Sequence, residues 1–231
     1  MREHKTHIKR GVSATHLDWT MVPYVRKSFF KHYVFEYLKY IGAVDTLDNL
    51  VDMDNEELDE WVHENREKLL TELGLTKEDF RLDNMDALDK HCAQAALFET
   101  KREVYQATES MYHNLNTLQS RSGGQLPFSS INYGTCTLPE GRMVIRALLD
   151  VSLHGLGKFG QTPIFPCGIF QCMKGVNRKP GDANYDLFRL ALRSTAKRLY
   201  PNYCNCDWSG NAGYDINDPK TYFSTINKTV A

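Results

Sequence analysis

The sequence predicts an α/β fold, because from residue 88 onwards helical and strand patterns alternate as helix, strand, helix, strand, helix. This alternation is typical of a parallel sheet whose strands are joined by right-handed helical crossovers. Gly123, Gly124 and Pro201 mark boundaries between the elements. Only two strands are evident, which is too few for a complete sheet, so further strands are expected.

Two long helices are predicted before the first strand. The first begins near Pro23, which suits an opening helical turn, and its aromatic and aliphatic residues recur as far as Ile41. The second covers about residues 88–118, where apolar residues recur every three or four positions until the paired glycines end it. Both helices therefore have an apolar side to bury.

An acidic stretch separates these two helices. Residues 45–83 contain fourteen Asp or Glu against four Lys or Arg, so the rest of a chain of net charge -1 carries about +9. Leucines recur within the stretch at helical spacing, which indicates a solvated helical excursion. The basic remainder suits a polyanionic small ligand or a nucleic acid, although charge alone favours neither.

The second half of the chain contains the alternating elements. Residues 126–135 predict a strand, and the capping-box pattern Thr137-x-x-Glu140 with Pro139 predicts a helix that closes at residues 155–160. Residues 164–172 predict a second strand. Residues 184–200 predict a last helix with one apolar side and one basic side.

Composition indicates a soluble globular protein. The chain has 231 residues, of which 42% are hydrophobic and 25% charged, and no run of apolar residues is long enough to span a membrane. The N-terminus has no apolar core of the kind a signal peptide needs, so we expect a cytoplasmic protein. The six cysteines are then expected to be free thiols.

Three short motifs have more ordinary interpretations than their letters suggest. Residues 155–160 match G-x-G-x-x-G, but they follow a predicted helix, whereas a dinucleotide site follows a strand. The spacing in Cys204-Asn-Cys206 is too short for a usual zinc site, so loop thiols are expected and no metal site is predicted. His91 and Cys92 are neighbours on a helix, so one is expected to be buried and the other exposed.

Residues 120–135 contain the most informative stretch. Two glycines precede the strand and allow close backbone approach to a ligand, while Ser129, Ser130 and Asn132 are polar groups in an otherwise apolar strand. Such groups need partners, which a bound sugar or phosphate would supply. A loop whose serines satisfy the backbone fits the same residues equally well.

This stretch reads HNLNTLQSRSGGQLPFSSINYGT over residues 113–135. It closely resembles the anaerobic (class III) ribonucleoside-triphosphate reductases. Further stretches that resemble this family, in the same order, are residues 11–29, 139–148, 161–166, 174–177, 180–182, 184–188, 196–202 and 218–225. Runs this long over nearly all the chain are far more specific than a short motif.

The resemblance implies an oxidoreductase with a ten-stranded α/β barrel, of the ribonucleotide reductase and glycyl radical enzyme type, with helices outside. Such a barrel reduces ribonucleoside triphosphates to deoxyribonucleoside triphosphates, the precursors for DNA replication, with formate as the reductant. It also implies a glycyl radical installed by a radical-SAM activating enzyme, a structural zinc in the C-terminal segment, nucleoside triphosphate effectors, allosteric control and a homodimer. Direct nucleic-acid binding and membrane association are not expected.

The resemblance further implies that this chain is an internal fragment. Residues 11–225 correspond to part of the barrel, whereas the leader 1–10 and the tail 226–231 do not resemble the family. The thiyl cysteine of the family follows the phrase that ends here at Thr225, where this chain continues Ile-Asn-Lys-Thr-Val-Ala. No catalytic residue is therefore carried over, and the chain is expected to be inactive without the remaining reductase segments.

The resemblance gives two groups of binding residues. Ser122, Gly123, Gly124 and Gln125 correspond in placement to the loop that passes effector identity to the substrate pocket. Ser129, Ser130 and Asn132 would then face that pocket. Two alternatives stay open for the chain as a whole, namely a non-catalytic nucleotide-binding or dimerisation module and a reading frame that yields no stable protein.

Overall fold

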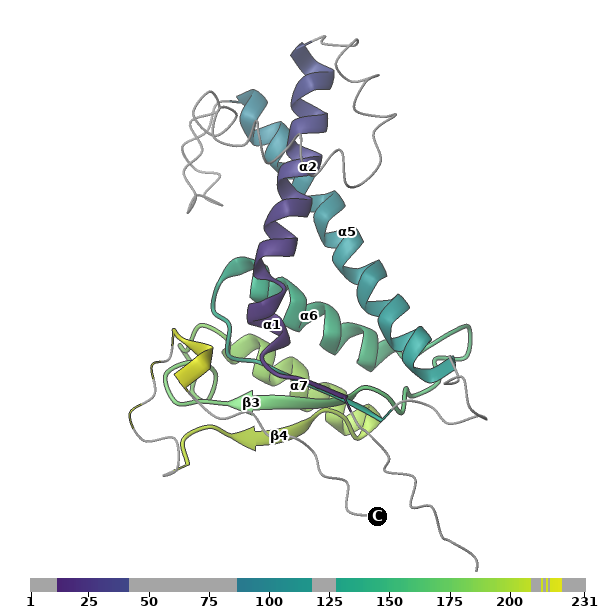
Figure 1. Ribbon diagram of the computed structural model, residues 1–231, viewed down its shortest axis with the longest axis vertical. Coiled ribbons are helices and arrows are strands. Elements are labelled where there is room, and N and C mark those ends of the chain that lie inside the picture. The colour runs from purple at the N-terminus through teal and green to yellow at the C-terminus, as the bar shows by residue number, and fades with distance from the viewer. Residues whose placement is uncertain are drawn as a thin grey trace, which may run out of the picture. The chain divides into compact units, whose positions relative to one another are not determined.

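The computed structural model describes residues 12–41, 87–117, 128–208, 213, 215 and 217–221 (Figure 1). The chain divides into two compact units, one formed by residues 1–22 and 104–231 and the other by residues 23–103. Four regions discussed above lie outside the described residues: the leader 1–10, the acidic stretch 45–83, the loop 122–125 and the tail 226–231.

The first unit is built on a four-stranded sheet. Its strands are β1 (Val12–Ala14), β2 (Ser129–Tyr133), β3 (Cys167–Cys172) and β4 (Asn202–Asn205). They lie in the order β1-β2-β3-β4, and every neighbouring pair is parallel. The predicted α/β class is therefore confirmed, and β1 and β4 supply strands that the sequence pattern left unidentified.

Helices connect the parallel strands. The short α1 (Leu17–Thr20) follows β1, α6 (Pro139–His154) joins β2 to β3, and α7 (Tyr185–Arg198) joins β3 to β4. Helices α6 and α7 pack against each other, so both crossovers lie in one layer (Figure 1). The 3₁₀ turn η3 (Pro219–Thr221) follows the sheet.

The start of α6 differs from the predicted capping box. The residue in the cap position is Leu138, one place later than Thr137, and it makes no side-chain cap hydrogen bond. Pro139 is the first helical residue, as its fixed φ favours. Glu140 is only 1% exposed, so the predicted reciprocal bond is replaced by burial of this side chain.

Aromatic side chains fill the space between the sheet and α7. Phe170 on β3 contacts Tyr133 on β2 with ring centroids 5.9 Å apart, and Phe188 on α7 with centroids 6.1 Å apart. Tyr203 on β4 closes the cluster, 6.2 Å from Phe188. Leu187 and Ala191 of α7 are fully buried beside it, as expected for an amphipathic crossover helix.

The second unit pairs two helices, α2 (Val22–Ile41) and the first part of α5 (Ala87–Thr117). Its core is a cluster of Phe29, Tyr33, Cys92, Ala93 and Ala96. At its margin the Tyr33 hydroxyl donates to Asp89 over 3.0 Å and the Ser28 hydroxyl donates to Glu103. Cys92 is buried and the adjacent His91 is exposed, which confirms the expected split.

Among the described residues, no helix combines the length and hydrophobicity needed to cross a lipid bilayer.

Candidate functional site

The parallel sheet has one markedly polar face. Paired residues of adjacent strands point to the same side, and the register pairs Ser130 with Cys167 and Ile169 with Asn202. Alternation along each strand then assigns eight residues to this side, which we call the polar face: Ser13, Ser130, Asn132, Cys167, Ile169, Gln171, Asn202 and Cys204. Seven of these eight side chains carry an oxygen, nitrogen or sulfur atom.

The opposite face of the sheet packs against α7. Phe170 and Tyr203, which alternate with the residues of the polar face, both contact Phe188 of that helix. The polar face therefore lies on the side away from the crossover layer. Among the described residues the crossover helices lie on one side of the sheet, and in a parallel sheet of this kind the other side can line an interior or a binding site.

Side chains of the polar face are held by hydrogen bonds between strands. The Ser130 hydroxyl donates to Ser13 Oγ over 2.9 Å, and Asn132 Nδ2 lies 3.4 Å from the carbonyl oxygen of Ala14. Asn202 Nδ2 donates to Cys167 Sγ over 3.2 Å. Asn132 and Gln171 are fully buried. The Asn132 amide, both buried and hydrogen-bonded, is an oriented group rather than a solvated surface group.

The structure separates the three predicted substrate residues. Ser130 and Asn132 lie together on the polar face, whereas alternation puts Ser129 on the other side of β2 with Ile131 and Tyr133. Ser129 Oγ is buried and has no hydrogen-bond partner among the described residues. The predicted effector residues Ser122, Gly123, Gly124 and Gln125 lie outside the part of the chain that the structure describes.

A buried carboxylate organises the loop that follows β2. Asp18 Oδ2 accepts hydrogen bonds from the backbone nitrogens of Gly134, Thr135 and Cys136 at 2.9, 3.0 and 2.9 Å. Three consecutive N–H groups that converge on one oxygen form an anion-binding nest, here filled by the protein's own side chain. Trp19 Nε1 donates to Thr135 Oγ1 over 3.1 Å beside it.

Two buried asparagines bind the carbonyl groups of the same loop. Asn177 Nδ2 donates to the oxygen of Gly134 over 3.0 Å and to that of Gln171 over 2.8 Å. Asn184 Nδ2 donates to the oxygens of Gly134 and Cys136 over 3.1 and 2.9 Å. Both side chains are 0% exposed. The carboxyl end of β2 is therefore fixed by residues that follow β1 and β3.

Complete burial raises the pKa of Asp18 above its ordinary value, and the hydrogen bonds from Cys136 and Gly134 oppose that rise. The second oxygen, Oδ1, has no hydrogen-bond partner among the described residues. Desolvation disfavours a charged carboxylate, and the hydrogen bonds from the three N–H groups offset part of that cost at this buried position.

Close packing surrounds this loop. A Cβ atom added to Gly141 of α6 would lie 2.2 Å from Cys136 Sγ and 2.6 Å from Cys136 Cβ. Such distances are far inside van der Waals contact, so only glycine fits where α6 passes the loop.

The sequence patterns indicate no role for Asp18, Asn177 or Asn184. Their partners lie up to 118 residues away along the chain, so neither periodicity nor spacing could reveal them. All three fall within stretches that carried the family resemblance, which was the only signal available.

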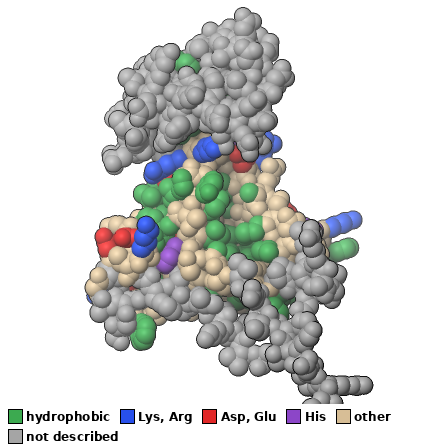
Figure 2. Space-filling model, in the orientation of Figure 1, with side chains coloured by type: hydrophobic (Ala, Val, Ile, Leu, Met, Phe, Trp, Pro, Cys, Tyr) green, Lys and Arg blue, Asp and Glu red, His purple; other side chains and the backbone are tan. Residues whose placement is uncertain are grey.

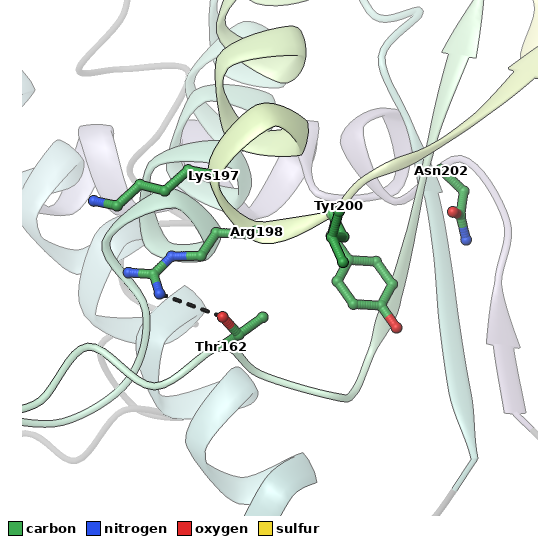
Figure 3. A pocket seen from close by; sticks show the side chains of 6 residues that line it. Thr162, Lys197, Arg198, Tyr200 and Asn202 are labelled. Atoms are coloured by element: carbon green, nitrogen blue, oxygen red, sulfur yellow. Dashed lines mark hydrogen bonds between the residues drawn. The ribbon is translucent and has the colours of Figure 1, made fainter.

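A hollow of about 440 Å³ lies at the amino end of β4 (Figure 3). It is lined by Thr162, Lys197, Arg198, Leu199, Tyr200 and Asn202. Arg198 points toward Thr162, whereas Lys197 points away from it. The Arg198 guanidinium donates to the backbone oxygens of Leu153, His154 and Gly160 at 2.9, 2.6 and 2.7 Å. The N–H groups of Arg198 are therefore already hydrogen-bonded within the protein, and few groups that line the hollow remain to bind an anion.

The structure also describes the glycine motif at residues 155–160 and the cysteines at positions 204 and 206. Gly155 follows the end of α6, and residues 155–160 form a turn closed by a bridge between Leu156 and Gln161, so the glycines do not lead from a strand into a helix. Cys204 lies on β4 and only Cys206 is in a turn, which corrects the expectation of two loop thiols. No group of three metal-binding side chains occurs among the described residues.

The space-filling view shows where apolar side chains gather. Hydrophobic side chains collect over the middle of that view, where Figure 1 places α1 and α6, and charged side chains lie at the margins (Figure 2).

An arginine joins α6 to α7. Arg142 Nη2 contacts both oxygens of Asp186 at 2.9 and 3.1 Å, and Arg142 Nη1 donates to Asn184 Oδ1 at 2.6 Å.

Comparison with known proteins places the chain in a family. A family model described as anaerobic ribonucleoside-triphosphate reductase matches residues 3–222. Proteins named anaerobic ribonucleoside-triphosphate reductase are 39% identical over 107 residues in Haemophilus influenzae and 39% identical over 108 residues in Escherichia coli. The protein of that name from Enterobacteria phage T4 is 42% identical over 104 residues.

These alignments cover 45–47% of this chain and 15–17% of the relatives. The aligned part is thus a small share of each relative, whereas the family model spans nearly the whole of this chain. The chain belongs to the family of anaerobic ribonucleoside-triphosphate reductases.

Proposed function

We propose that this chain is part of the catalytic barrel of an anaerobic ribonucleoside-triphosphate reductase, and that its polar face lines the site for the substrate. The proposed reaction replaces the 2′-hydroxyl of a ribonucleoside triphosphate by hydrogen, with formate as the reductant. The observation that carries the proposal is the oriented polar face opposite the helical layer, in a chain of this family.

The order of the strands supports a barrel. Four parallel strands lie in sequence order with the crossover helices α6 and α7 packed together, which is how the wall of an α/β barrel is built. In a wall of this kind the side away from the helices faces the interior. A ten-stranded barrel would therefore enclose Ser130 and Asn132.

Ser130 and Asn132 are suited to hold a ribose or a phosphate. A hydroxyl and a carboxamide offer both donors and acceptors to sugar hydroxyls and donors to phosphate oxygens. Burial of Asn132 beside β1 fixes its orientation before a ligand arrives. We propose these two residues, and not Ser129, as substrate contacts, because Ser129 lies on the other side of β2.

The remaining assignments are proposals that rest on the family. Residues 122–125 would pass effector identity to the pocket, the enzyme would be a homodimer, and a radical-SAM enzyme would activate it. A glycyl radical would supply the hydrogen-atom chemistry through a cysteine thiyl, and a structural zinc would belong to the C-terminal segment of the enzyme. We assign none of these groups, and no catalytic residue, to this chain.

A chimera tests the proposed activity. The segment of the Escherichia coli relative that aligns with this chain is replaced by the corresponding residues from this chain, and CTP reduction is assayed without oxygen after activation. Deoxycytidine triphosphate formation that falls at least tenfold on Asn132→Ala, but not on the control Thr117→Ala, supports the proposal. A folded chimera that binds CTP without reducing it, or whose activity is indifferent to Asn132, points instead to a non-catalytic nucleotide-binding module.

A further inference from the structure

Helix α7 has one exposed side. Leu187, Ala191 and Ser194 of this helix are buried. From position 189 onwards the exposed residues recur every three or four positions, which places them together on one side of the helix. They are Arg189, Leu192, Arg193, Ala196 and Lys197, and they are followed by the exposed cap residue Leu199. We call these six residues the outer face of α7.

Apolar side chains form a line on the outer face. Leu192 and Ala196 are four positions apart, and Leu199 follows three positions later at the end of the helix. Leu192 is 46% exposed and Leu199 is 81% exposed. Anchors with this spacing are the kind that meet the apolar side of a second helix.

A basic row runs beside the apolar line. Arg189, Arg193 and Lys197 recur every four residues, so their Cα atoms lie about 6 Å apart along the helix. Among the described residues, none of these three side chains makes an ion pair or a hydrogen bond. Arg146 on α6, by contrast, pairs with Asp186. The charges of the basic row are therefore available to an anionic partner.

The sequence of this chain contains a stretch of the complementary kind. Residues 45–64, which lie outside the described part of the chain, include nine Asp or Glu and no Lys or Arg. At 3.6 residues per turn, six of its seven apolar residues would fall within about 120° of one another. These six are Leu47, Leu50, Val51, Leu58, Trp61 and Val62. The spacing predicts an acidic segment with one apolar side.

We propose that the outer face of α7 binds residues 45–64 of a second copy of this chain. The apolar line covers the apolar side of the segment, and the basic row faces its carboxylates. Each copy has one such face and one such segment, so the exchange is reciprocal and closes as a dimer. This contact is independent of the reaction proposed above.

Both length and chemistry favour this partner. The 14 residues of α7 span about 21 Å, and residues 47–62 would span about 24 Å as a helix. Paired helices of similar length bury an apolar seam that opposite charges flank. A polyanion such as a nucleic acid would engage only the basic row, because phosphates offer nothing to Leu192 and Leu199.

Sedimentation of the full chain measures the association. We expect a monomer–dimer equilibrium whose dissociation constant rises about tenfold or more between about 50 mM and about 500 mM NaCl, because salt screens exposed charges. Arg193→Glu/Lys197→Glu should raise this constant at least as much at low salt. The matched control Lys101→Glu/Lys179→Glu changes the net charge equally at two other exposed positions and should leave it unchanged.

A charge exchange tests the partner. Glu60→Lys/Glu64→Lys should also weaken the dimer, and its combination with Arg193→Glu/Lys197→Glu should restore it. Leu192→Ser should weaken the dimer, whereas Phe98→Ser, which removes another exposed apolar side chain, should not. Circular dichroism confirms that each variant is folded. A combination that stays as weak as the single reversals would overturn the proposal.

Cross-linking shows which copy supplies the segment. Light and nitrogen-15-labelled chains are mixed, and a carbodiimide joins lysine amines to neighbouring carboxylates. We expect Lys197 joined to residues 45–64, in pairs that contain one light and one heavy peptide. Links confined to a single copy would overturn the proposal. So would a wild-type chain that stays monomeric and uses Arg193 and Lys197 to bind an oligonucleotide or anionic vesicles.

Discussion

The carboxylate of Asp18 lies 2.9 Å from the backbone nitrogen of Cys136, although the two residues are 118 positions apart in the chain. The same oxygen also accepts from Gly134 and Thr135. This relationship joins the segment after β1 to the loop after β2, and so fixes the carboxyl end of the sheet beside the polar face. Removal of the Asp18 carboxylate should therefore lower the free energy of unfolding.

Asp18→Ala should lower the free energy of unfolding by about 3–5 kcal/mol, because it leaves three buried N–H groups without an acceptor. Asp18→Asn keeps one acceptor oxygen and should lose roughly half as much. Urea unfolding followed by circular dichroism measures both. The matched control is Asp182→Ala, which removes one exposed hydrogen bond to the nitrogen of Lys179. Equal losses for Asp18→Ala and Asp182→Ala would contradict the structural role of the nest.

Gly141→Ala should destabilise the first unit by about 1–3 kcal/mol, the usual result of overpacking, because the new Cβ would overlap Cys136 Sγ and Cβ. In a Cys136→Gly background both contacts with Cys136 disappear, and the backbone oxygen of Asp18, 3.2 Å from the new Cβ, stays close to it. There the same substitution should cost much less stability, because the higher helix propensity of alanine offsets part of the remaining contact. A double-mutant cycle in urea measures this difference. A constant loss in both backgrounds would show that the contact with Cys136 is not the cause.

Arg142→Ala should destabilise the packing of α6 on α7 more than Arg146→Ala does. Arg142 contacts Asp186 and Asn184 from both of its terminal nitrogens, whereas Arg146 makes one contact with Asp186. We expect a loss of about 1–2 kcal/mol for the first variant and under about 0.5 kcal/mol for the exposed single pair. Thermal unfolding at low and high salt measures both, and similar losses for the two variants would count against this assignment.

The alkylation rate of Cys172 should depend steeply on pH. Burial raises the pKa of this thiol to about 11; Cys204 and Asp207 act in the same direction and Arg178 opposes them. Only the thiolate reacts, so at pH 8 about one molecule in a thousand is reactive and the rate should rise about tenfold per pH unit up to pH 10.

Two variants test the electrostatic cause of this pKa. Arg178→Ala removes the cation that favours the thiolate and should slow alkylation of Cys172, whereas Asp207→Asn removes an anion and should speed it. Iodoacetamide labelling is read by fragmentation of the tryptic peptide 159–174, which separates Cys172 from Cys167 on the same peptide. A wild-type rate that levels off below pH 9 would contradict the raised pKa.

The longer elements of this fold could be predicted from the sequence because their signals are local. The helix predicted at about 88–118 is α5, that at 184–200 is α7, and the strands at 126–135 and 164–172 contain β2 and β3. Strands β1 and β4 have three and four residues, too few for an alternating pattern to stand out. They become strands through pairing with β2 and β3, which is a tertiary effect.

The candidate site could be predicted only in part. Ser130 and Asn132 were visible as polar residues in an apolar strand, and the strand period of two separates them from Ser129 once the register is known. Asp18, Asn177 and Asn184 act through contacts between segments distant in sequence. Such contacts depend on the register of the whole sheet, which no local pattern specifies.

Protection of Cys167 by a ribonucleoside triphosphate tests most directly whether the polar face binds substrate. Cys167 lies on that face beside Ser130, and Cys172, on the same strand, lies on the opposite face, so the chain contains its own control. We predict that CTP lowers the labelling rate of Cys167 several-fold and saturably, leaves Cys172 unchanged, and loses its effect in Asn132→Ala. Labelling of Cys167 that is unaffected by CTP, or equal protection of both cysteines, would contradict a nucleotide site on this face.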